Sequence, residues 1–239
     1  MMLVTGDWHG EHRVNKMCLP NIDKLTKDDF LFVCGDWGYV FFGNKLEESH
    51  LNNIEKKYPF TLCVVDGNHE NFELLYQYPE EEWNGGRVHR IRKNIVHLMR
   101  GQIFTINGKK IFSFGGGYSY DKEMRQEKVS WWPQEMPSEE EYEIGRQNLM
   151  EAGFKVDYIL SHTAPSDTVA IFHEPHSKEV RLNFFLEWVR EETEYKHWYF
   201  GHFHRDEDLW RHQTVLHFDV RDMETNASIF DEEGAKRYF

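Results

Sequence analysis

The chain has 239 residues, of which 40% are hydrophobic and 29% charged, a size and composition that suit one folded core and exclude a disordered chain. The formal net charge of -13 gives no surface-wide attraction for a nucleic-acid backbone, although bound divalent cations would reverse the sign locally. The apolar runs are too short to span a membrane, and no linker interrupts the chain, so we expect a single domain over residues 1–239.

Five short apolar runs, each followed by Gly, Asp, Asn, Ser or His, are typical of buried strands. They are Met2–Thr5, Phe30–Cys34, Thr61–Val65, 158–160 and His197–Phe200. Helices are predicted between them at Lys45–Lys57, from Ser138 towards Gly153, and over 178–192. Ser138 and Glu141 form a capping-box pattern, and Gly153 suits the position after a helix end. Strands that alternate with helices indicate an α/β fold.

The region between Val88 and Gly117 has a different pattern. The runs 95–99, Gln102–Ile106 and 110–114 are separated by Arg100-Gly101 and by Asn107-Gly108, and Asn-Gly between apolar runs indicates a β-hairpin. We therefore expect an antiparallel section that joins the main sheet or faces it as a second sheet. The next segment, 118–137, has little periodicity and contains Trp131 and Trp132, which is typical of a long surface excursion that covers a site.

The cysteines indicate a reducing compartment. They number three, namely Cys18, Cys34 and Cys63, and the last two lie inside apolar runs as small buried hydrophobes would. Met1 leads almost directly into the first strand, without the pattern of a signal peptide. These observations predict a soluble, cytoplasmic protein with no membrane contact.

Polar side chains of a few types follow the predicted strands. They are Asp7, His9, Asp36, Asn68, His69, His162, His202 and His204. Because strand ends on the carboxyl side of an α/β sheet meet in one crevice, we expect these residues to lie together. The i,i+2 spacing of the pair Asp7/His9 and of the pair His202/His204 would place both side chains of each pair on one side of an extended chain. The glycines before them would allow sharp turns or a close approach of the backbone.

These residue types favour a particular kind of metal centre. Imidazole and carboxylate ligands without thiolate suit Mn²⁺, Fe or Zn²⁺ better than Ca²⁺. Asp7 and Asp36 would bring about two negative charges against about four positive charges from two divalent ions, and Asn68 would add none. The surplus of positive charge is what an anionic phosphate requires, so the ligand set predicts phosphoryl chemistry.

The order of these motifs resembles the calcineurin-like metallophosphoesterase superfamily. Its five motifs appear here as Gly6-Asp7-Trp8-His9, Gly35-Asp36, Gly67-Asn68-His69-Glu70, His162 and Gly201-His202-Phe203-His204. The match extends from Asp7 to His204, which is most of the chain. The resemblance implies an α/β fold in which a two-sheet mixed β-sandwich is flanked by helices.

The resemblance also implies a role for each residue. One divalent ion would bind Asp7, His9 and His204, a second would bind Asn68, His162 and His202, and Asp36 would bridge them. Mn²⁺ is the expected metal, with Fe or Zn²⁺ as alternatives, and a hydroxide between the ions would attack phosphorus in line. His69 would face the substrate phosphate, where it would stabilise charge and protonate the leaving oxygen.

The second motif departs from that of the protein phosphatases in this superfamily. Those enzymes continue Gly-Asp with a further Asp and an Arg that binds phosphate, whereas Asp36 is followed here by Trp37-Gly38-Tyr39-Val40. A protein Ser/Thr phosphatase is therefore disfavoured. Some other residues must then hold the substrate, and the segment 118–137 offers candidates.

Two interpretations of that segment stay open. Tyr118, Arg125 and Trp131 would line the substrate pocket, with Arg125 or Lys122 pairing with a phosphate, or else the tryptophans would close a small satellite core under a long loop. His173 and His176 are likewise either ordinary surface residues or part of the mouth of the crevice.

The function expected is hydrolysis of a phosphomonoester or phosphodiester in a small substrate. A nuclease that acts on nucleic-acid ends is the alternative, which the acidic composition and the lack of a basic cluster disfavour. A non-catalytic scaffold of the same fold would show gaps in the ligand set, above all at His69, and the sequence has none. The sequence specifies no oligomeric state.

Overall fold

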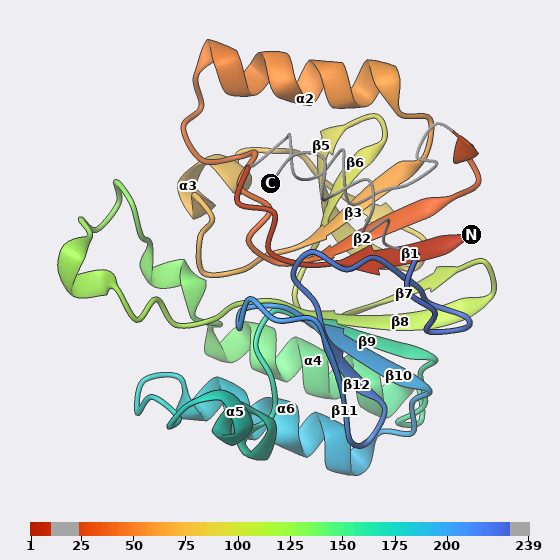
Figure 1. Cartoon of the computed structure of the whole chain (residues 1–239), viewed down its shortest axis with the longest axis vertical. Helices are drawn as coiled ribbons and strands as arrows, with labels where there is room; N and C mark the ends of the chain where they lie inside the picture. Colours follow the sequence, from red (N-terminus) through yellow and green to blue (C-terminus); the bar gives the residue numbers. More distant parts are fainter. Residues whose placement is uncertain (11–23, 230–239) are drawn as a thin grey trace.

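The computed structural model describes residues 1–10 and 24–229, which form two β-sheets with helices on their outer faces (Figure 1). The first sheet contains β1 (Met2–Thr5), β2 (Phe30–Cys34), β3 (Thr61–Val65), β4 (Glu80–Trp83), β5 (Gly86–Arg92), β6 (Ile95–Leu98) and β13 (Arg221–Asp222). The second contains β7 (Gln102–Ile106), β8 (Lys109–Phe114), β9 (Tyr158–Ser161), β10 (His197–Phe200), β11 (Glu207–Leu209) and β12 (Gln213–Val215).

Both sheets mix parallel and antiparallel pairs. The strand order is β13-β1-β2-β3-β6-β5-β4 in one sheet and β11-β12-β10-β9-β8-β7 in the other. Strands β1, β2 and β3 are parallel neighbours, and so are β9 and β10. The mixed two-sheet α/β fold expected from the sequence is confirmed.

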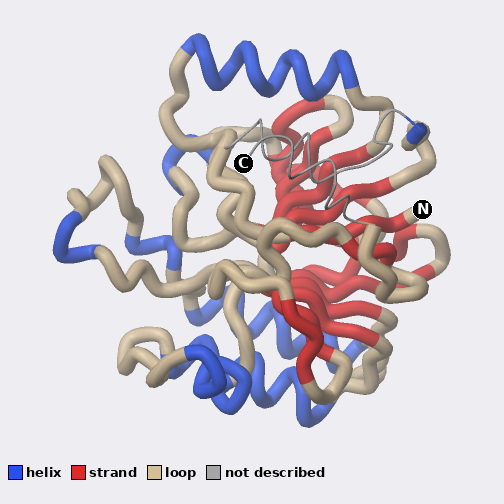
Figure 2. Tube along the Cα trace, in the orientation of Figure 1, coloured by secondary structure: helices blue, strands red, loops and turns tan. Residues whose placement is uncertain are grey.

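Helices cover the outer face of each sheet (Figure 2). On the side of the first sheet lie α2 (Lys45–Lys57) and α3 (Phe72–Leu75), and on the side of the second lie α4 (Glu139–Glu151), α5 (Ser166–Phe172) and α6 (Val180–Glu192). The segment 118–137 extends away from the sheets and contains the short 3-10 turns η2 (Lys122–Met124) and η3 (Pro133–Glu135).

The core is layered because side chains alternate along each strand. In β2, Leu31 and Val33 pack with residues of α2, whereas Phe32 and Cys34 pack between the two sheets. A third cluster joins the second sheet to α4 and α6. Both faces of the central strands are therefore buried, which explains why their sequences are continuous apolar runs.

The antiparallel section divides between the sheets. The chain leaves the first sheet after β6, turns at Gly101 with φ of 75°, and enters the second sheet as the hairpin β7–β8 around Asn107-Gly108. The Asn-Gly hairpin is thus confirmed. The strands β4 and β5 were not expected, because the Glu-rich β4 is an exposed edge strand without an apolar pattern.

The predicted helix ends and buried cysteines are confirmed where the structure describes them. Ser138 and Glu141 form the capping box of α4, and Gly153 follows that helix with φ of 68°. Cys34 and Cys63 are buried free thiols, while Cys18 lies outside the described residues. Within residues 1–10 and 24–229, no helix has the length and apolar character needed to cross a bilayer.

Candidate metal centre

The candidate ligands follow strands that end at one edge of the two sheets. Asp7, Asp36 and Asn68 come after β1, β2 and β3, while His162 and His202 come after β9 and β10. Parallel pairing aligns these strand ends, and the stacking of the sheets brings the two sets together. Residues from opposite ends of the chain therefore meet in one cluster.

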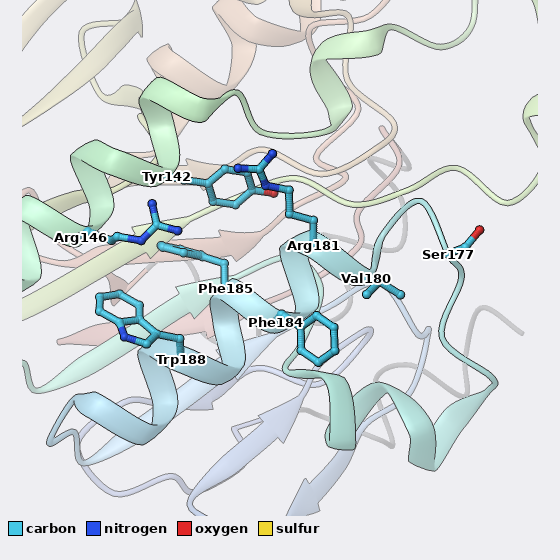
Figure 3. Close-up of a pocket in the computed structure, with 8 residues that line it drawn as sticks. All are labelled: Tyr142, Arg146, Ser177, Val180, Arg181, Phe184, Phe185 and Trp188. Carbon is cyan, nitrogen blue, oxygen red and sulfur yellow. The ribbon is translucent and has the colours of Figure 1, made fainter.

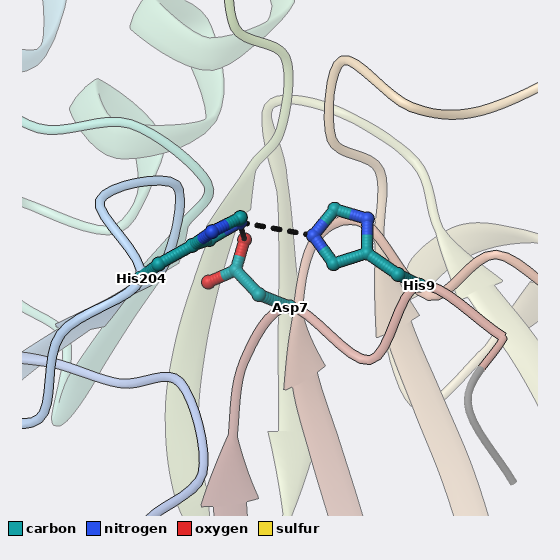
Figure 4. A group of neighbouring side chains, drawn as sticks. All are labelled: Asp7, His9 and His204. Atoms are coloured by element: carbon teal, nitrogen blue, oxygen red, sulfur yellow. Dashed lines mark hydrogen bonds and ion pairs between the residues drawn. The ribbon is translucent and has the colours of Figure 1, made fainter.

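Asp7, His9 and His204 form the first group (Figure 4). Each offers one ligand atom, and these atoms lie within 4.8 Å of one another. The Nε2 atoms of His9 and His204 are 3.0 Å apart, and His204 Nε2 is 3.8 Å from an oxygen of Asp7. The geometry is that of three donors directed at one point.

A second group surrounds His162. Its Nε2 lies 2.9 Å from Asn68 Oδ1, 3.4 Å from Asp36 Oδ1 and 3.2 Å from His202 Nδ1. The other oxygen of Asp36 is 3.8 Å from His9 Nε2 in the first group. The carboxylate of Asp36 thus lies between the two groups with one oxygen towards each.

The backbone at five of these positions has an unusual conformation. Asp7, His9, Asp36, His202 and His204 have φ between 45° and 69°, the left-handed region that residues with a Cβ rarely adopt. Our expectation of extended chain at the i,i+2 pairs was therefore wrong, because both residues of each pair have left-handed backbone conformations. Such costly conformations concentrate at functional sites.

Two glycines allow these turns to pack closely. A Cβ on Gly67 would lie 2.1 Å from Asp36 Oδ1, and one on Gly201 would lie 2.4 Å from Asp7 Oδ2. No larger residue fits at either position, so the backbone at these glycines approaches the carboxylates closely. The main chain is thereby held against the two candidate carboxylate ligands.

The two carboxylates have opposite shifts in pKa. Burial, and then the neighbouring charge of Asp36, raise the pKa of Asp7 well above its ordinary range. Burial acts in the same direction on Asp36, but the imidazoles of His162, His69 and His9 outweigh it and lower the pKa of Asp36. A cation in contact with both carboxylates would relieve the cost of burying the Asp7 charge.

The neutral form is favoured for the imidazoles of His202 and His204. Burial lowers the pKa of His202 well below its usual range, and His162 acts in the same direction. Burial and the neighbouring His9 likewise lower the pKa of His204. Neutral imidazoles and carboxylates are the forms that bind divalent metal ions, so the residues present fit the two ions implied by the motifs.

Further contacts orient the ligands. His162 Nδ1 is 2.9 Å from the carbonyl oxygen of Cys34. The backbone N–H of His202 donates to the two oxygens of the Asp7 carboxylate at 3.0 and 2.9 Å. A hydrogen bond on the far nitrogen of a histidine sets the orientation of the ring towards a metal. His162 is therefore held with Nε2 towards the cluster.

His69 lies beside this cluster and not within either group of candidate ligands in the described chain. Its backbone N–H donates to Asp36 Oδ1 at 2.8 Å, and its ring packs edge-on against His9 with centroids 5.2 Å apart. Burial lowers the pKa of His69. The imidazole is hydrogen-bonded to the Arg125 guanidinium, which places a cationic side chain from the segment 118–137 at the centre.

Arg125 has one donor that is not used within the protein. Its Nε pairs with Asp121 at 2.9 Å and its Nη2 contacts His69, but its buried Nη1 has no hydrogen-bond partner among the described residues. Leaving a buried guanidinium donor unpaired is costly. An anion beside His69 would satisfy it.

The aromatic residues of the same segment have different surroundings. Tyr118 is only 7% exposed and stacks on His176 with centroids 4.2 Å apart, so His176 does reach this region. Trp131 is partly buried under Lys122, whose Nζ lies 4.2 Å from the ring. Trp132 is buried against Phe41 and belongs to the main core beneath α2, and not to a small satellite core under the loop.

Three buried polar residues near the cluster were not predicted. Ser119 is hydrogen-bonded to Asn68, Glu135 to Ser119, and Glu179 lies 3.7 Å from His202. None belongs to a motif, and each is isolated in sequence from the residue that it contacts. No signal in the sequence identifies them.

A cavity of about 480 Å³ lies elsewhere, between α4 and α6 (Figure 3). Aromatic rings, among them Phe184 and Trp188, and the guanidinium groups of Arg146 and Arg181 line it. Both arginines pair with acidic residues of α4, namely Glu143 and Glu139. None of the lining residues is a candidate ligand, so this cavity is separate from the metal centre.

Comparison with known proteins identifies a family for the chain. The sequence model of a family described as calcineurin-like phosphoesterase matches residues 2–206. No curated protein matches the chain. Two solved structures are similar to it. One is a phosphopantetheinyl hydrolase from Mycobacterium tuberculosis, which is 16% identical over 90% of this chain and 87% of that chain, with a TM-score of 0.49. The other is a putative 5'-nucleotidase from Staphylococcus aureus in complex with alpha-ketoglutarate, which is 13% identical over 96% of this chain and 52% of that chain, with a TM-score of 0.48.

Proposed function

We propose a function from one premise: the chain belongs to the calcineurin-like phosphoesterase family. Membership supports a phosphoester hydrolase, and we propose that the cluster around Asp36 binds two divalent metal ions, Mn²⁺ in the first instance with Fe or Zn²⁺ as alternatives. The substrate would be a small phosphomonoester or phosphodiester. The observation that carries this proposal is the position of Asp36, which has one oxygen near His9 and the other near His162.

Each group of residues has a defined part in the proposal. Asp7, His9 and His204 would hold one ion, Asn68, His162 and His202 the other, and Asp36 both. Two such ions supply Lewis-acid polarisation of a phosphoryl oxygen and lower the pKa of a bound water.

The groups that would act on the substrate lie beside the ligands. His69 would donate a hydrogen bond to the phosphoryl group or a proton to the leaving oxygen. The unpaired Nη1 of Arg125 would donate to a phosphate oxygen. Arg125 would thus take the part of the phosphate-binding Arg of the protein phosphatases, which is missing after Asp36. Tyr118 and Trp131 stay predictions as substrate contacts.

The first test is metal-dependent ester hydrolysis. We expect the protein to hydrolyse p-nitrophenyl phosphate or bis-p-nitrophenyl phosphate when Mn²⁺ is added, and to lose that activity in chelator, because the ions supply the polarisation. Release of nitrophenolate measures both, and preference for the diester would identify a phosphodiesterase. Protein that contains two metal ions per chain yet hydrolyses neither ester would contradict the proposal and favour a non-catalytic scaffold.

The second test is Arg125→Ala. A hydrogen bond between charged groups is worth about 1.5–3 kcal/mol, so its loss should raise KM by roughly tenfold to hundredfold. Metal content should not change, because Arg125 contacts His69 and Asp121 and none of the proposed ligands. Arg125→Lys should recover part of the loss, and Lys128→Ala, a change at an exposed cation in the same segment, is the matched control. An unchanged KM in Arg125→Ala would remove Arg125 from the substrate site.

We also propose that residues 1–239 form one domain and that the protein is cytoplasmic. The buried free thiols of Cys34 and Cys63 support the reducing compartment. We propose a small substrate and not a nucleic acid, because the net charge of the chain is -13 and its sequence contains no clustered basic tract.

A further inference from the structure

A hydrogen bond to Ser119 holds the side-chain amide of Asn68. Its Nδ2 donates to Ser119 Oγ at 3.1 Å, and its Oδ1 is 2.9 Å from His162 Nε2. Only the oxygen of an amide binds a metal ion, and its NH₂ group would be repelled. The contact with Ser119 therefore determines which end of Asn68 faces the cluster.

Ser119 is itself oriented by a buried carboxylate. Its hydroxyl donates to Glu135 Oε2 at 2.8 Å, its backbone N–H donates to Glu135 Oε1 at 3.1 Å, and Lys122 Nζ lies 2.5 Å from the same Oε1. Ser119 is 1% exposed and Glu135 0%. Because a hydroxyl has one proton, donation to Glu135 leaves a lone pair on Oγ to accept from Asn68.

A second buried carboxylate contacts the other side of the cluster. Glu179 precedes α6, is 0% exposed, and accepts hydrogen bonds from the Tyr118 N–H at 3.0 Å and the Tyr120 hydroxyl at 3.3 Å. Its Oε1 lies 3.7 Å from His202 Nε2, whereas His202 Nδ1 faces His162. Nε2 of His202 thus points to the carboxylate and Nδ1 to the cluster.

We propose that Ser119, Glu135 and Glu179 are positioning residues for one of the two metal ions. Ser119 and Glu135, within the segment 118–137, hold Asn68 in the orientation that binds the ion. Glu179, which accepts hydrogen bonds from Tyr118 and Tyr120 of that segment, holds His202. The inference rests on the proposed function, because both ligands belong to the same proposed ion. Outer carboxylates and hydroxyls of this kind fix ligand orientation and raise the basicity of the bound imidazole. The segment would then fix the orientation of two metal ligands as well as contribute to the substrate pocket.

Metal binding by the full chain, stripped of metal and titrated with Mn²⁺ in a calorimeter, tests this directly. The variants are Ser119→Ala and Glu179→Gln. The matched controls are Ser130→Ala, in the same segment but hydrogen-bonded to Gln126 alone among the described residues, and Glu187→Gln on α6. Loss of an outer contact should weaken one of two binding events by about 10–100-fold and leave the other unchanged.

A merely structural role would give a different result. If the residues only orient the ligands, the thermal unfolding midpoint of each metal-free variant should stay close to that of its control. If they stabilise the fold, that midpoint should fall. Asn68→Ala removes the ligand on which Ser119 acts, so adding Ser119→Ala to it should cause no further loss of affinity. An additive loss in the double variant would overturn the inference for Ser119.

The remaining outcomes are also decisive. Two binding events of wild-type affinity in both Ser119→Ala and Glu179→Gln would overturn the proposal, and so would a fall in both events together with a lower thermal midpoint. Should one variant fail to fold, the other still tests the same ion from the opposite side. Wild-type protein that binds no Mn²⁺, Fe or Zn²⁺ would instead refute the proposed function, which keeps the two failures distinct.

Discussion

The variant Asp36→Asn should lose metal-dependent hydrolysis by roughly a thousandfold or more, because Lewis-acid stabilisation by metal ions is worth several kcal/mol. Asp36 has one oxygen 3.4 Å from His162 Nε2 and the other 3.8 Å from His9 Nε2, so its charge serves both proposed ions. The amide has the same shape but no charge, and it can still accept the His69 N–H. The measurement is kcat/KM for a nitrophenyl ester at saturating Mn²⁺.

Thermal unfolding separates this effect from a loss of fold. A ligand that binds the folded state raises the midpoint, so Mn²⁺ should stabilise the wild type and stabilise Asp36→Asn much less. Asp28→Asn, at an exposed carboxylate before β2 and so at the opposite end of that strand from Asp36, should respond to Mn²⁺ as the wild type does. Two Mn²⁺ ions bound with wild-type affinity in Asp36→Asn, together with full activity, would refute the bridging role.

The variant His69→Ala should retain both metal ions and lose roughly a hundredfold or more in kcat, the usual scale for removal of an acid or base. His69 lies outside the two donor groups, and its backbone N–H, which contacts Asp36, survives the substitution. Metal analysis and turnover on the same preparation measure the two effects. His212→Ala, at an exposed histidine, is the control for the substitution itself. Equal turnover in His69→Ala and wild type would exclude the role.

The leaving group distinguishes the two roles proposed for His69. Nitrophenolate leaves without a proton, whereas a phenyl or alkyl alcohol requires one. If His69 protonates the leaving oxygen, the loss in His69→Ala should be larger for phenyl phosphate than for p-nitrophenyl phosphate. An equal loss for both esters would assign His69 to stabilisation of the phosphoryl charge.

Much of the central fold could be predicted because its signals are local. The strands at Met2–Thr5, Phe30–Cys34, Thr61–Val65 and His197–Phe200 are continuous apolar runs, since both of their faces are buried. The exposed strand β4 carries no such run, although the Asn84-Gly85 turn that joins it to β5 is the same dipeptide that indicates the hairpin at Asn107-Gly108.

The identity of the candidate ligands was also accessible from the sequence, whereas the way they converge was not. Asp7 and His9 lie together because left-handed turns rotate their side chains, and not because the chain is extended. Those turns depend on contacts that no local pattern contains, such as the close packing of Gly201 against Asp7.

The sequence by itself determined which donors follow which strands and, through the order of the five motifs, the family to which they belong. Only the tertiary structure decided which buried groups surround those donors. Ser119 meets Asn68 across 51 positions of sequence, and Tyr120 meets Glu179 across 59. The physical reason is that buried hydrogen bonds between distant segments exist only after the sheets and the segment 118–137 have packed, so their partners leave no periodic or compositional trace in the chain.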